Sequence, residues 1–499
     1  MENTPKSIYN NYLKNNLDIE STIEHLISII EHSENLIYRL ESINYISNLG
    51  VKNSKIFNCL ENLLISENNE SIRYNSSIAL KSLFGKKALN PFKWSLYHES
   101  SLRCLIVILN SICEINDSYS KSIIISRIKE IQDPIFRDEI KFIEKKHHVE
   151  QLSINFLTEL LKNYYILRDL KKRFAQIHFK LNNGLIVELD LSDIGSHIFG
   201  SNILSKFPES IIHLKALKKL NLKFNRLSKI PQSIGLLNSL EELDLSYNRI
   251  KELPPSIGML RSLIYLKISY NKIKHIPKTI GMLKSLKLLD ARMNYIEEIP
   301  QTINNLTNLE ILDLHGNKLK SLPPNLKKLS SLKILILGSN KFKKIPESIK
   351  YMKNLYELDL KGNKILKIPE WIKKLKSLVI LRMPDNKINE LPKGLGSLKS
   401  LEILALWNNK LKNLPKTMGK LKNIKDLNLS WNELKYLPEW IGSLKSLTTL
   451  SLWGNSLKEI PSSIMKLKNL KILDLNFNNI KTIPNFMLEL EKKGLIIYK

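Results

Sequence analysis

A strict 23-residue period runs through the second two-thirds of this chain. Proline recurs thirteen times at this step, from Pro208 to Pro484. Asparagine recurs twelve times at the same step, at Asn225, Asn248, Asn271, Asn294, Asn317, Asn340, Asn363, Asn386, Asn409, Asn432, Asn455 and Asn478. Chance does not hold twelve asparagines in phase. A period of 20–50 residues is typical of a chain built by stacking copies of one small unit.

Each position in the unit has a physical role, as the copy from Leu243 to Leu263 illustrates. Its L-x-L segment predicts a short strand, because alternate side chains point to opposite faces. The two leucines, Leu243 and Leu245, would face the core. The asparagine would turn the chain out of the strand, and its buried amide must then bond to backbone groups nearby. Proline fixes φ and starts a short helical or extended return. No unit can bury its own leucines alone, so we expect the strands to stack into one long parallel sheet.

The unit L-P-x-x-I-G-x-L-x-x-L-x-x-L-x-L-x-x-N contains the leucine-rich-repeat signature L-x-x-L-x-L-x-x-N-x-L. At this length it resembles the cytosolic Ras-group leucine-rich-repeat proteins, which include the Ras-suppressor and scribble types and the plant intracellular Ras-group repeats. The resemblance implies an α/β solenoid, a horseshoe of about 13 repeats with a parallel concave sheet. It also implies a signalling scaffold whose concave face binds a folded protein, in several members a small GTPase or a phosphatase subunit. No partner-specific motif of that group maps onto residues of this chain.

The two ends of the array depart from the repeat. The first strand, at 187–191, is followed by Ile194 where an asparagine would stand. An eight-residue insertion containing Gly195 and Gly200 lies between Ser192 and Pro208, and either adapts the cap or forms a binding loop. After Pro484 the residues 486–490 and 494–498 predict a last helix and a half-strand that close the open sheet edge.

The first 180 residues are helical by pattern. Ser21 and Glu24 form a capping-box pattern, and aliphatic residues follow at helical spacing. Segments that begin at Arg39 and Arg73 align at a step of 34, with small residues three positions on and aliphatic residues seven positions on. This resembles HEAT-type helical repeats; an unrelated helical bundle is the alternative. We therefore predict an N-terminal segment at 1–20, an all-α, HEAT-like domain at 21–180 that caps the solenoid, and the leucine-rich-repeat domain at 181–499.

Positive charge is concentrated in the repeats. The formal net charge is +29, and from Lys180 onward there are 54 Lys and Arg against 27 Asp and Glu. Lysine is frequent just after each repeat asparagine and again just before the strands, so it would line both rims. These rims could attract an acidic protein, nucleic acid or an anionic membrane surface. The alternative is a coding bias, since Lys, Asn and Ile are all abundant.

Composition also suggests a compartment. With 43% hydrophobic residues disorder is not expected, and no run of 18 apolar residues predicts a membrane span. The residues 1–7 lack the apolar core of a signal peptide. The only cysteines, Cys59, Cys104 and Cys113, lie in the first quarter, so the repeats carry no disulfide staple. We therefore predict a cytoplasmic protein.

The sequence shows no constellation for catalysis. It has no P-loop, no G-x-G-x-x-G after a strand, and no spacing that argues for a Ser, His and Asp set. His147 and His148 have no nearby cysteine or spaced carboxylate pair, so a solvated helix face is preferred to a metal site. Cys104 and Cys113 are interpreted as buried structural thiols. We predict a protein that is not an enzyme and that holds no cofactor and no metal.

The register also shows which side chains leave the core on the concave side, namely the two positions before each repeat asparagine. Aromatic residues there form two groups with a polar, mostly basic stretch between them. The predicted protein-binding residues are Phe224, Tyr247, Tyr270, Arg292, His315, Lys361, Arg382, Asp385, Trp407, Trp431, Trp453 and Phe477. Contiguous exposed aromatics usually mark a contact surface; tolerated surface aromatics or self-association is the alternative. Trp371 and Trp440 fall on the return segment, where convex packing is expected.

These observations predict a non-enzymatic protein-binding scaffold in intracellular signalling. The alternative is an electrostatic binder of nucleic acid or of an anionic membrane surface through the lysine rims. Nucleic acid is disfavoured because its binding grooves interleave aromatic and basic residues, which are segregated here.

Overall fold

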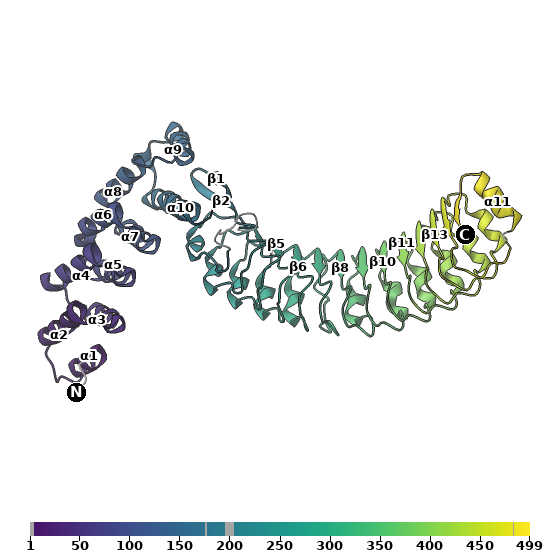
Figure 1. The fold of residues 1–499 in the computed structure, drawn as a ribbon, viewed down its shortest axis with the longest axis horizontal. Helices are drawn as coiled ribbons and strands as arrows, with labels where there is room; N and C mark the ends of the chain where they lie inside the picture. Colours follow the sequence, from purple (N-terminus) through teal and green to yellow (C-terminus); the bar gives the residue numbers. More distant parts are fainter. Residues whose placement is uncertain (1–3, 175–176, 195–203, 483) are drawn as a thin grey trace. The chain divides into compact units, whose positions relative to one another are not determined.

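The computed structural model describes residues 4–174, 177–194, 204–482 and 484–499 (Figure 1). The chain forms two compact units, unit 1 with Met1–Glu188 and Ser210–Ala216 and unit 2 with Leu189–Glu209 and Leu217–Lys499. Within the described ranges no helix is both long and apolar enough to cross a membrane.

Unit 1 is helical. Its helices are α1 (Pro5–Leu13), α2 (Ile19–His32), α3 (Leu36–Leu49), α4 (Ser54–Ser66), α5 (Glu70–Phe84), α6 (Leu89–His98), α7 (Leu102–Ile115), α8 (Ser118–Lys129), α9 (Pro134–Lys146) and α10 (Ile154–Arg173). Two 3₁₀ turns, η1 (Gly85–Ala88) and η2 (Val149–Gln151), and the strand β1 (His178–Asn182) complete it, and β2 (Leu185–Asp190) leads into unit 2. Most of these helices start at an Asp, Asn or Ser whose side-chain oxygen accepts a backbone N–H of the first turn, which is why they begin where they do.

The helices of unit 1 pack in pairs. In one row α3, α5, α7 and α10 contact each other in turn, and α2, α4, α6 and α8 each pack against the next helix of that row. The two segments that align at a step of 34 residues, which begin at Arg39 and Arg73, lie in α3 and α5 and so occupy successive places in this row. The Arg39 guanidinium of α3 lies 2.6 Å from Glu67, and that of Arg73 in α5 lies 2.8 Å from Glu99. Buried Ser42 and the serines of α5 let these helices approach closely. Assignment to HEAT repeats stays a prediction.

Unit 2 is a stack of strands and 3₁₀ turns. The strands are β3 (Lys219–Asn221), β4 (Glu242–Asp244), β5 (Tyr265–Lys267), β6 (Leu288–Asp290), β7 (Ile311–Asp313), β8 (Ile334–Ile336), β9 (Glu357–Asp359), β10 (Ile380–Arg382), β11 (Ile403–Ala405), β12 (Asp426–Asn428), β13 (Thr449–Ser451), β14 (Ile472–Asp474) and β15 (Ile496–Tyr498). They are hydrogen-bonded in sequence order. Every pair from β3 to β14 is parallel and joins residues 23 apart, as in Leu243 with Leu266. The predicted solenoid with a parallel sheet is confirmed.

The return segment of most 23-residue repeats in unit 2 is a 3₁₀ helix. These are η3 (Glu209–His213), η4 (Gln232–Leu236), η5 (Pro255–Met259), η6 (Lys278–Met282), η7 (Gln301–Asn305), η8 (Glu347–Tyr351), η9 (Glu370–Lys374), η10 (Lys393–Ser397), η11 (Lys416–Lys420), η12 (Glu439–Ser443) and η13 (Ser462–Lys466). Each from η4 onward follows directly on a repeat proline, whose fixed φ suits the entry to the turn. The core lies between this layer and the sheet: Leu243, Leu245 and Ile250 are fully buried, and each contributes roughly 1.5–3 kcal/mol.

The repeat asparagines join neighbouring units through backbone groups, as predicted. The amide of Asn248 donates to the carbonyls of Leu222, in the unit before, at 2.8 Å and Leu245 at 3.1 Å. Its Oδ1 accepts the N–H of Leu227 at 2.9 Å. The carbonyl of Leu222 also accepts from Asn225, so consecutive asparagines share one acceptor. Each asparagine therefore bonds one repeat to the next, and an isolated repeat would lack these bonds.

The ends of unit 2 are asymmetric. At the C-terminal end α11 (Asn485–Lys492) replaces the 3₁₀ turn, and β15 adds to β14 in parallel, as predicted. At the other end residues 195–203 of the predicted insertion lie outside the described residues, so its role as a cap or a binding loop stays a prediction.

Candidate functional site

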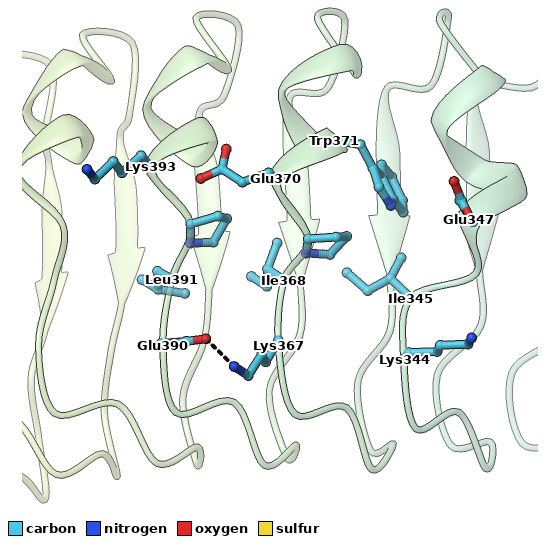
Figure 2. A pocket seen from close by; sticks show the side chains of 12 residues that line it. Lys344, Ile345, Glu347, Lys367, Ile368, Glu370, Trp371, Glu390, Leu391 and Lys393 are labelled. Carbon is cyan, nitrogen blue, oxygen red and sulfur yellow. Dashed lines mark ion pairs between the residues drawn. The ribbon is translucent and has the colours of Figure 1, made fainter.

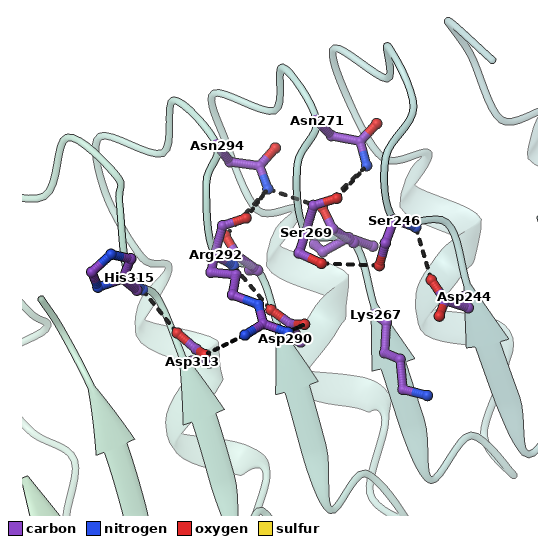
Figure 3. Close-up of polar contacts among 12 residues, drawn as sticks. Asp244, Ser246, Lys267, Ser269, Asn271, Asp290, Arg292, Asn294, Asp313 and His315 are labelled. Carbon is purple, nitrogen blue, oxygen red and sulfur yellow. Dashed lines mark hydrogen bonds and ion pairs between the residues drawn. The ribbon is translucent and has the colours of Figure 1, made fainter. Parts of the chain in front are cut away.

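Four columns of side chains leave the core on the sheet side of unit 2. We number positions from the repeat asparagine. Positions −5 and −3 hold buried residues, so positions −6 and −4 on the strand and −2 and −1 in the following turn point outward. We call these 48 positions, four in each of twelve units, the strand face. Figure 3 shows part of it, from Asp244 to His315.

The −1 column is held in an unusual backbone conformation. All twelve residues have a positive φ, between 51° and 68°. Three are glycine, but six are bulky: Phe224, Tyr247, Tyr270, Met293, Trp431 and Phe477. A left-handed φ costs a residue with a Cβ roughly 1–2 kcal/mol. Backbone strain of this kind is typical of functional sites. The two positions before each asparagine, where the register predicts the exposed aromatic residues, lie after the strand and not on it, because every strand from β3 to β14 ends at position −4.

The first aromatic cluster comprises Phe224, Tyr247 and Tyr270. Ring centroids of Phe224 and Tyr247 lie 4.3 Å apart, and those of Tyr247 and Tyr270 stack at 4.2 Å with 10° between planes. All three side chains are exposed. The Lys223 ammonium lies 4.6 Å from the Phe224 ring centre. The structure therefore brings the first predicted group together as a continuous stack.

The second aromatic cluster comprises Trp431, Trp453 and Phe477. The two indoles meet edge to face at 5.1 Å, and the Phe477 ring lies 6.0 Å from Trp453. Phe477 is 78% exposed, the most exposed large apolar side chain described. A Cβ on Gly454 would lie 2.9 Å from the Trp431 ring, so this glycine gives the indole its place.

Trp407 is half-buried and stands apart from the second cluster. No ring contact joins it to Trp431 in the described part of the chain; instead the Lys361 ammonium lies 5.1 Å from its ring centre. Lys361 also lies 3.9 Å from Asp385. Arg382, from the strand β10, forms an ion pair with Glu357. Lys361 and Asp385 thus form a charged pair beside the Trp407 indole.

The aspartates of the −4 column have a structural role that the sequence interpretation missed. Asp244 Oδ1 accepts the N–H of Ser246 at 2.9 Å, and Asp313 accepts that of His315 at 3.0 Å (Figure 3). The same bond recurs at Asp359 and Asp474. This is an Asx turn that leads the chain from strand to turn. The pattern D-x-x-x-N is the sequence signal for this turn.

A buried carboxylate pair lies at the centre of the strand face. Asp290 and Asp313 are only 8% exposed, and the Arg292 guanidinium lies 3.1 Å from the first and 3.9 Å from the second (Figure 3). Burial raises the pKa of the Asp313 carboxyl, and the negative charge of Asp290 raises it further. The cation of Arg292 opposes both effects. Arg292 therefore holds two carboxylates that would otherwise repel each other.

The strand face carries little of the positive charge of this chain. Its 48 positions hold six Lys or Arg against nine Asp or Glu, a net of −3, whereas the chain carries +29. The basic stretch predicted between the aromatic clusters is offset there by carboxylates. The face is thus aromatic at both ends and nearly neutral overall.

A groove on the opposite, 3₁₀ side of unit 2 was not anticipated. Its volume is about 650 Å³, and Figure 2 shows the half-buried Trp371 lying over it beside Ile345 and Ile368. Its charged border includes Lys367, paired with Glu390 at 2.6 Å. Trp440, in the equivalent slot three repeats on, packs on Gly419 instead. The sequence gives both tryptophans the same Pro-Glu-Trp-Ile setting, but Gly419 stands 21 residues before Trp440, where Lys350 stands before Trp371.

The described residues offer little reactive chemistry. No group of three His, Cys, Asp or Glu among them could hold a metal ion. Burial raises the pKa of the Cys59 thiol to about 12 and that of Cys104 to about 11, so both stay protonated at neutral pH. Cys113 is half-buried, and its Sγ lies 2.9 Å from Asn155.

Sequence comparison identifies the family to which these repeats belong. The family model described as a leucine-rich repeat region matches residues 189–294, 258–337, 278–360, 324–436 and 416–492. These overlapping matches span more than half of the chain, which therefore belongs to the leucine-rich-repeat family. No curated protein matches this chain in sequence.

Solved structures show the same repeat fold. A leucine-rich-repeat protein of Leptospira interrogans is 36% identical over 60% of this chain and 82% of its own length, with a TM-score of 0.53. A TDR receptor is 29% identical, with a TM-score of 0.52, over 59% of this chain and 53% of the receptor, so the chain spans about half of that protein. An internalin of Listeria monocytogenes has a TM-score of 0.54 at 21% identity, over 68% of this chain and 94% of its own, and supports the fold alone.

Proposed function

We propose that this protein is a non-enzymatic scaffold that binds a protein partner on the strand face of unit 2. The observation that carries the proposal is the occupancy of the −1 column. Six bulky apolar side chains stand in a left-handed conformation that glycine or asparagine would adopt at lower cost. Folding alone does not favour such residues, whereas large exposed aromatics are the residues that dominate protein interfaces.

The two aromatic clusters define the kind of partner. Seven units separate Tyr270 from Trp431, which is about 34 Å at the usual 4.8 Å between parallel strands. A partner that contacts both clusters therefore presents an elongated surface. The near-neutral charge of the strand face favours a partner that is not highly acidic there, because nine carboxylates face it. Arg292, His315, Lys361 and Asp385 would supply polar contacts between the clusters.

The resemblance to Ras-group repeats suggests a more specific function. By that resemblance the protein would act in intracellular signalling in the cytoplasm, and its partner would be a small GTPase or a phosphatase subunit. Nothing in the strand face selects between these two. Mass spectrometry of proteins purified with the full chain from its own cell would decide whether either is present.

The test uses residues that the chain itself places in the same slots. Asn408 occupies position −1 and Ser430 position −2 with the fold intact. A variant carrying Tyr247→Asn, Tyr270→Asn, Trp431→Asn and Trp453→Ser therefore removes four rings and keeps the backbone. We expect recovery of the partner to fall at least tenfold, because such side chains commonly contribute more than 1 kcal/mol each.

The matched control removes exposed rings elsewhere in unit 2. Tyr295→Asn, Tyr351→Lys and Tyr436→Asn change exposed side chains outside the strand face. This variant should recover the partner as the unchanged chain does. Equal recovery by the strand-face variant, with an unchanged circular dichroism spectrum, would show that the aromatic clusters do not bind it.

A further inference from the structure

A second surface of unit 2 has a very different charge. Positions +1 and +3 after each repeat asparagine leave the core on one lateral side of the repeats. These 24 positions hold sixteen Lys or Arg and only two acidic residues. We call them the lateral stripe. Its basic members are Arg226, Arg249, Lys251, Lys272, Lys274, Lys318, Lys320, Lys341, Lys343, Lys364, Lys387, Lys410, Lys412, Lys435, Lys458 and Lys481.

The backbone holds the lateral stripe in a regular array. Position +2 between its two columns is buried, as at Phe342 and Ile365. The N–H at position +1 donates to the carbonyl at +2 of the unit before, for example Lys364 to Phe342 at 2.8 Å. This bond recurs from Arg226 to Asn479. Successive units are therefore about 4.8 Å apart here too, and eleven steps extend about 50 Å.

The cations of the lateral stripe are almost all unpaired. Among the described residues one ion pair involves the stripe, between Lys412 and Glu433 at 3.8 Å. The Lys318 ammonium lies 4.8 Å from the Tyr295 ring centre. All sixteen side chains except Lys318 are exposed. Neighbouring cations lie within one Debye length, about 8 Å in physiological salt, so they repel each other. An array like this destabilises the fold slightly unless an anionic partner neutralises it.

The other lysine row has a structural explanation. On the opposite side of the 3₁₀ turns, lysines just before the strands donate to a carbonyl of the next unit. Examples are Lys399 to Lys420 at 2.9 Å and Lys422 to Ser443 at 2.8 Å. The same bond is made by Lys284, Lys376 and Lys445. The two predicted lysine rims are thus not equivalent, because five lysines of this row donate to a carbonyl of the next repeat, whereas no described lysine of the lateral stripe makes such a bond.

Basic residues are distributed unevenly between two exposed surfaces, the strand face and the lateral stripe. The strand face has six basic residues in 48 positions, whereas the lateral stripe has sixteen in 24. Basic residues are therefore concentrated on the lateral stripe relative to the strand face.

We propose that the lateral stripe binds the surface of an anionic lipid bilayer. Fourteen of its sixteen cations are lysine, which acts as a hydrated point charge, whereas arginine is the preferred residue for bidentate phosphate and nucleic-acid contacts. Tyr295 is the one aromatic residue in the stripe, so it lacks the stacking platforms of single-strand binders. Basic residues near an anionic bilayer each add about fivefold to its binding constant. The proposal is independent of partner binding on the strand face.

The test is vesicle sedimentation with the full chain. The probes are vesicles of phosphatidylcholine alone and of phosphatidylcholine with 30% phosphatidylserine, each at 50 and 300 mM salt. The stripe variant carries Gln in place of Lys341, Lys343, Lys364, Lys387 and Lys410, all exposed and without ion pairs. The control carries Gln at five exposed lysines of the 3₁₀ side, Lys278, Lys373, Lys374, Lys416 and Lys466, and so has the same net charge.

We expect binding to anionic vesicles only, weaker at 300 mM salt, and lowered on the order of 10³-fold in the stripe variant. The control should bind within a few-fold of the unchanged chain. Equal losses in both variants would overturn the proposal, because net charge and not the stripe would then act. Absence of binding at 50 mM salt would overturn it as well. A single-stranded DNA or RNA oligonucleotide that binds where vesicles do not would also overturn it.

Discussion

At the scale of single residues, the −1 column of the strand face holds bulky side chains in a backbone conformation that disfavours them. Its φ angles, all between 51° and 68°, are the same whether the slot holds Gly362, Asn408 or Trp431. The backbone is therefore set by the repeat, and the side chain adapts to it. A bulky residue accepts a conformational cost that asparagine and glycine largely avoid.

Phe477 offers the clearest test of this cost. It is 78% exposed, and its one ring neighbour, Trp453, lies 6.0 Å away. We expect Phe477→Asn to raise the free energy of unfolding by about 0.5–1 kcal/mol, because asparagine tolerates a positive φ. The midpoint of urea unfolding, followed by circular dichroism, measures it.

Phe477→Leu is the matched control, because it keeps a bulky Cβ substituent at the same φ and should give no gain. A loss of more than 1 kcal/mol in Phe477→Asn would show that the ring stabilises the fold.

At the scale of the structural elements, the asparagine ladder joins one unit to the next. Asn363 donates to the carbonyls of Leu337 and Leu360 and accepts the N–H of Phe342 at 3.0 Å. Asn363→Ala would leave the buried Phe342 N–H without an acceptor and would remove one of the two asparagine donors from each of the Leu337 and Leu360 carbonyls. We expect a loss of about 2–4 kcal/mol in the free energy of unfolding, with faster hydrogen exchange at the Phe342 amide.

The exposed Asn389 is the control for this substitution, since no side-chain hydrogen bond of it is recorded in the described chain. Asn389→Ala should stay within about 0.5 kcal/mol of the unchanged chain. A similar effect of both substitutions would contradict the role of the ladder.

The sequence predicted the elements of unit 2 well because each is set by local chemistry repeated thirteen times. Leucine alternation, the buried asparagine and the proline each allow few conformations. For the same reason the register assigns each aromatic residue to a slot of its repeat, although Trp407 contacts Lys361 and stands apart from the second cluster. The direction of a side chain after the strand was not predictable, since it depends on a positive φ that the pattern does not indicate.

Other features depend on contacts that no pattern records. Trp407 turns to Lys361, two units before it, and not to the next indole. Trp371 borders a groove while Trp440 packs on a glycine. The sequence does not indicate which lysines donate to a carbonyl of the next repeat, because this depends on where the carbonyl oxygens lie in the folded chain. The spacing in the sequence gives the position of a residue within its repeat, whereas the contacts of its side chain depend on the neighbouring residues in the folded chain.

At the scale of the whole molecule, unit 2 separates its surface properties by face. The strand face carries exposed rings and a net charge of −3, and the lateral stripe carries sixteen cations against two carboxylates. The 3₁₀ side uses its lysines to bond successive units. A rigid repeat can separate properties in this way because each slot recurs at fixed spacing. We therefore expect substitutions to alter the proposed partner binding and the proposed lipid binding separately.

The most direct test of the central claim is a hydrogen-exchange footprint of the full chain with its purified partner. We predict that binding slows exchange in the turns that carry the aromatic clusters, at residues 222–225, 245–248, 268–271, 429–432 and 452–455. Exchange in the 3₁₀ helices η5 to η12 should not change. Protection confined to the 3₁₀ side or to unit 1, with none in the turns of the strand face, would contradict the account.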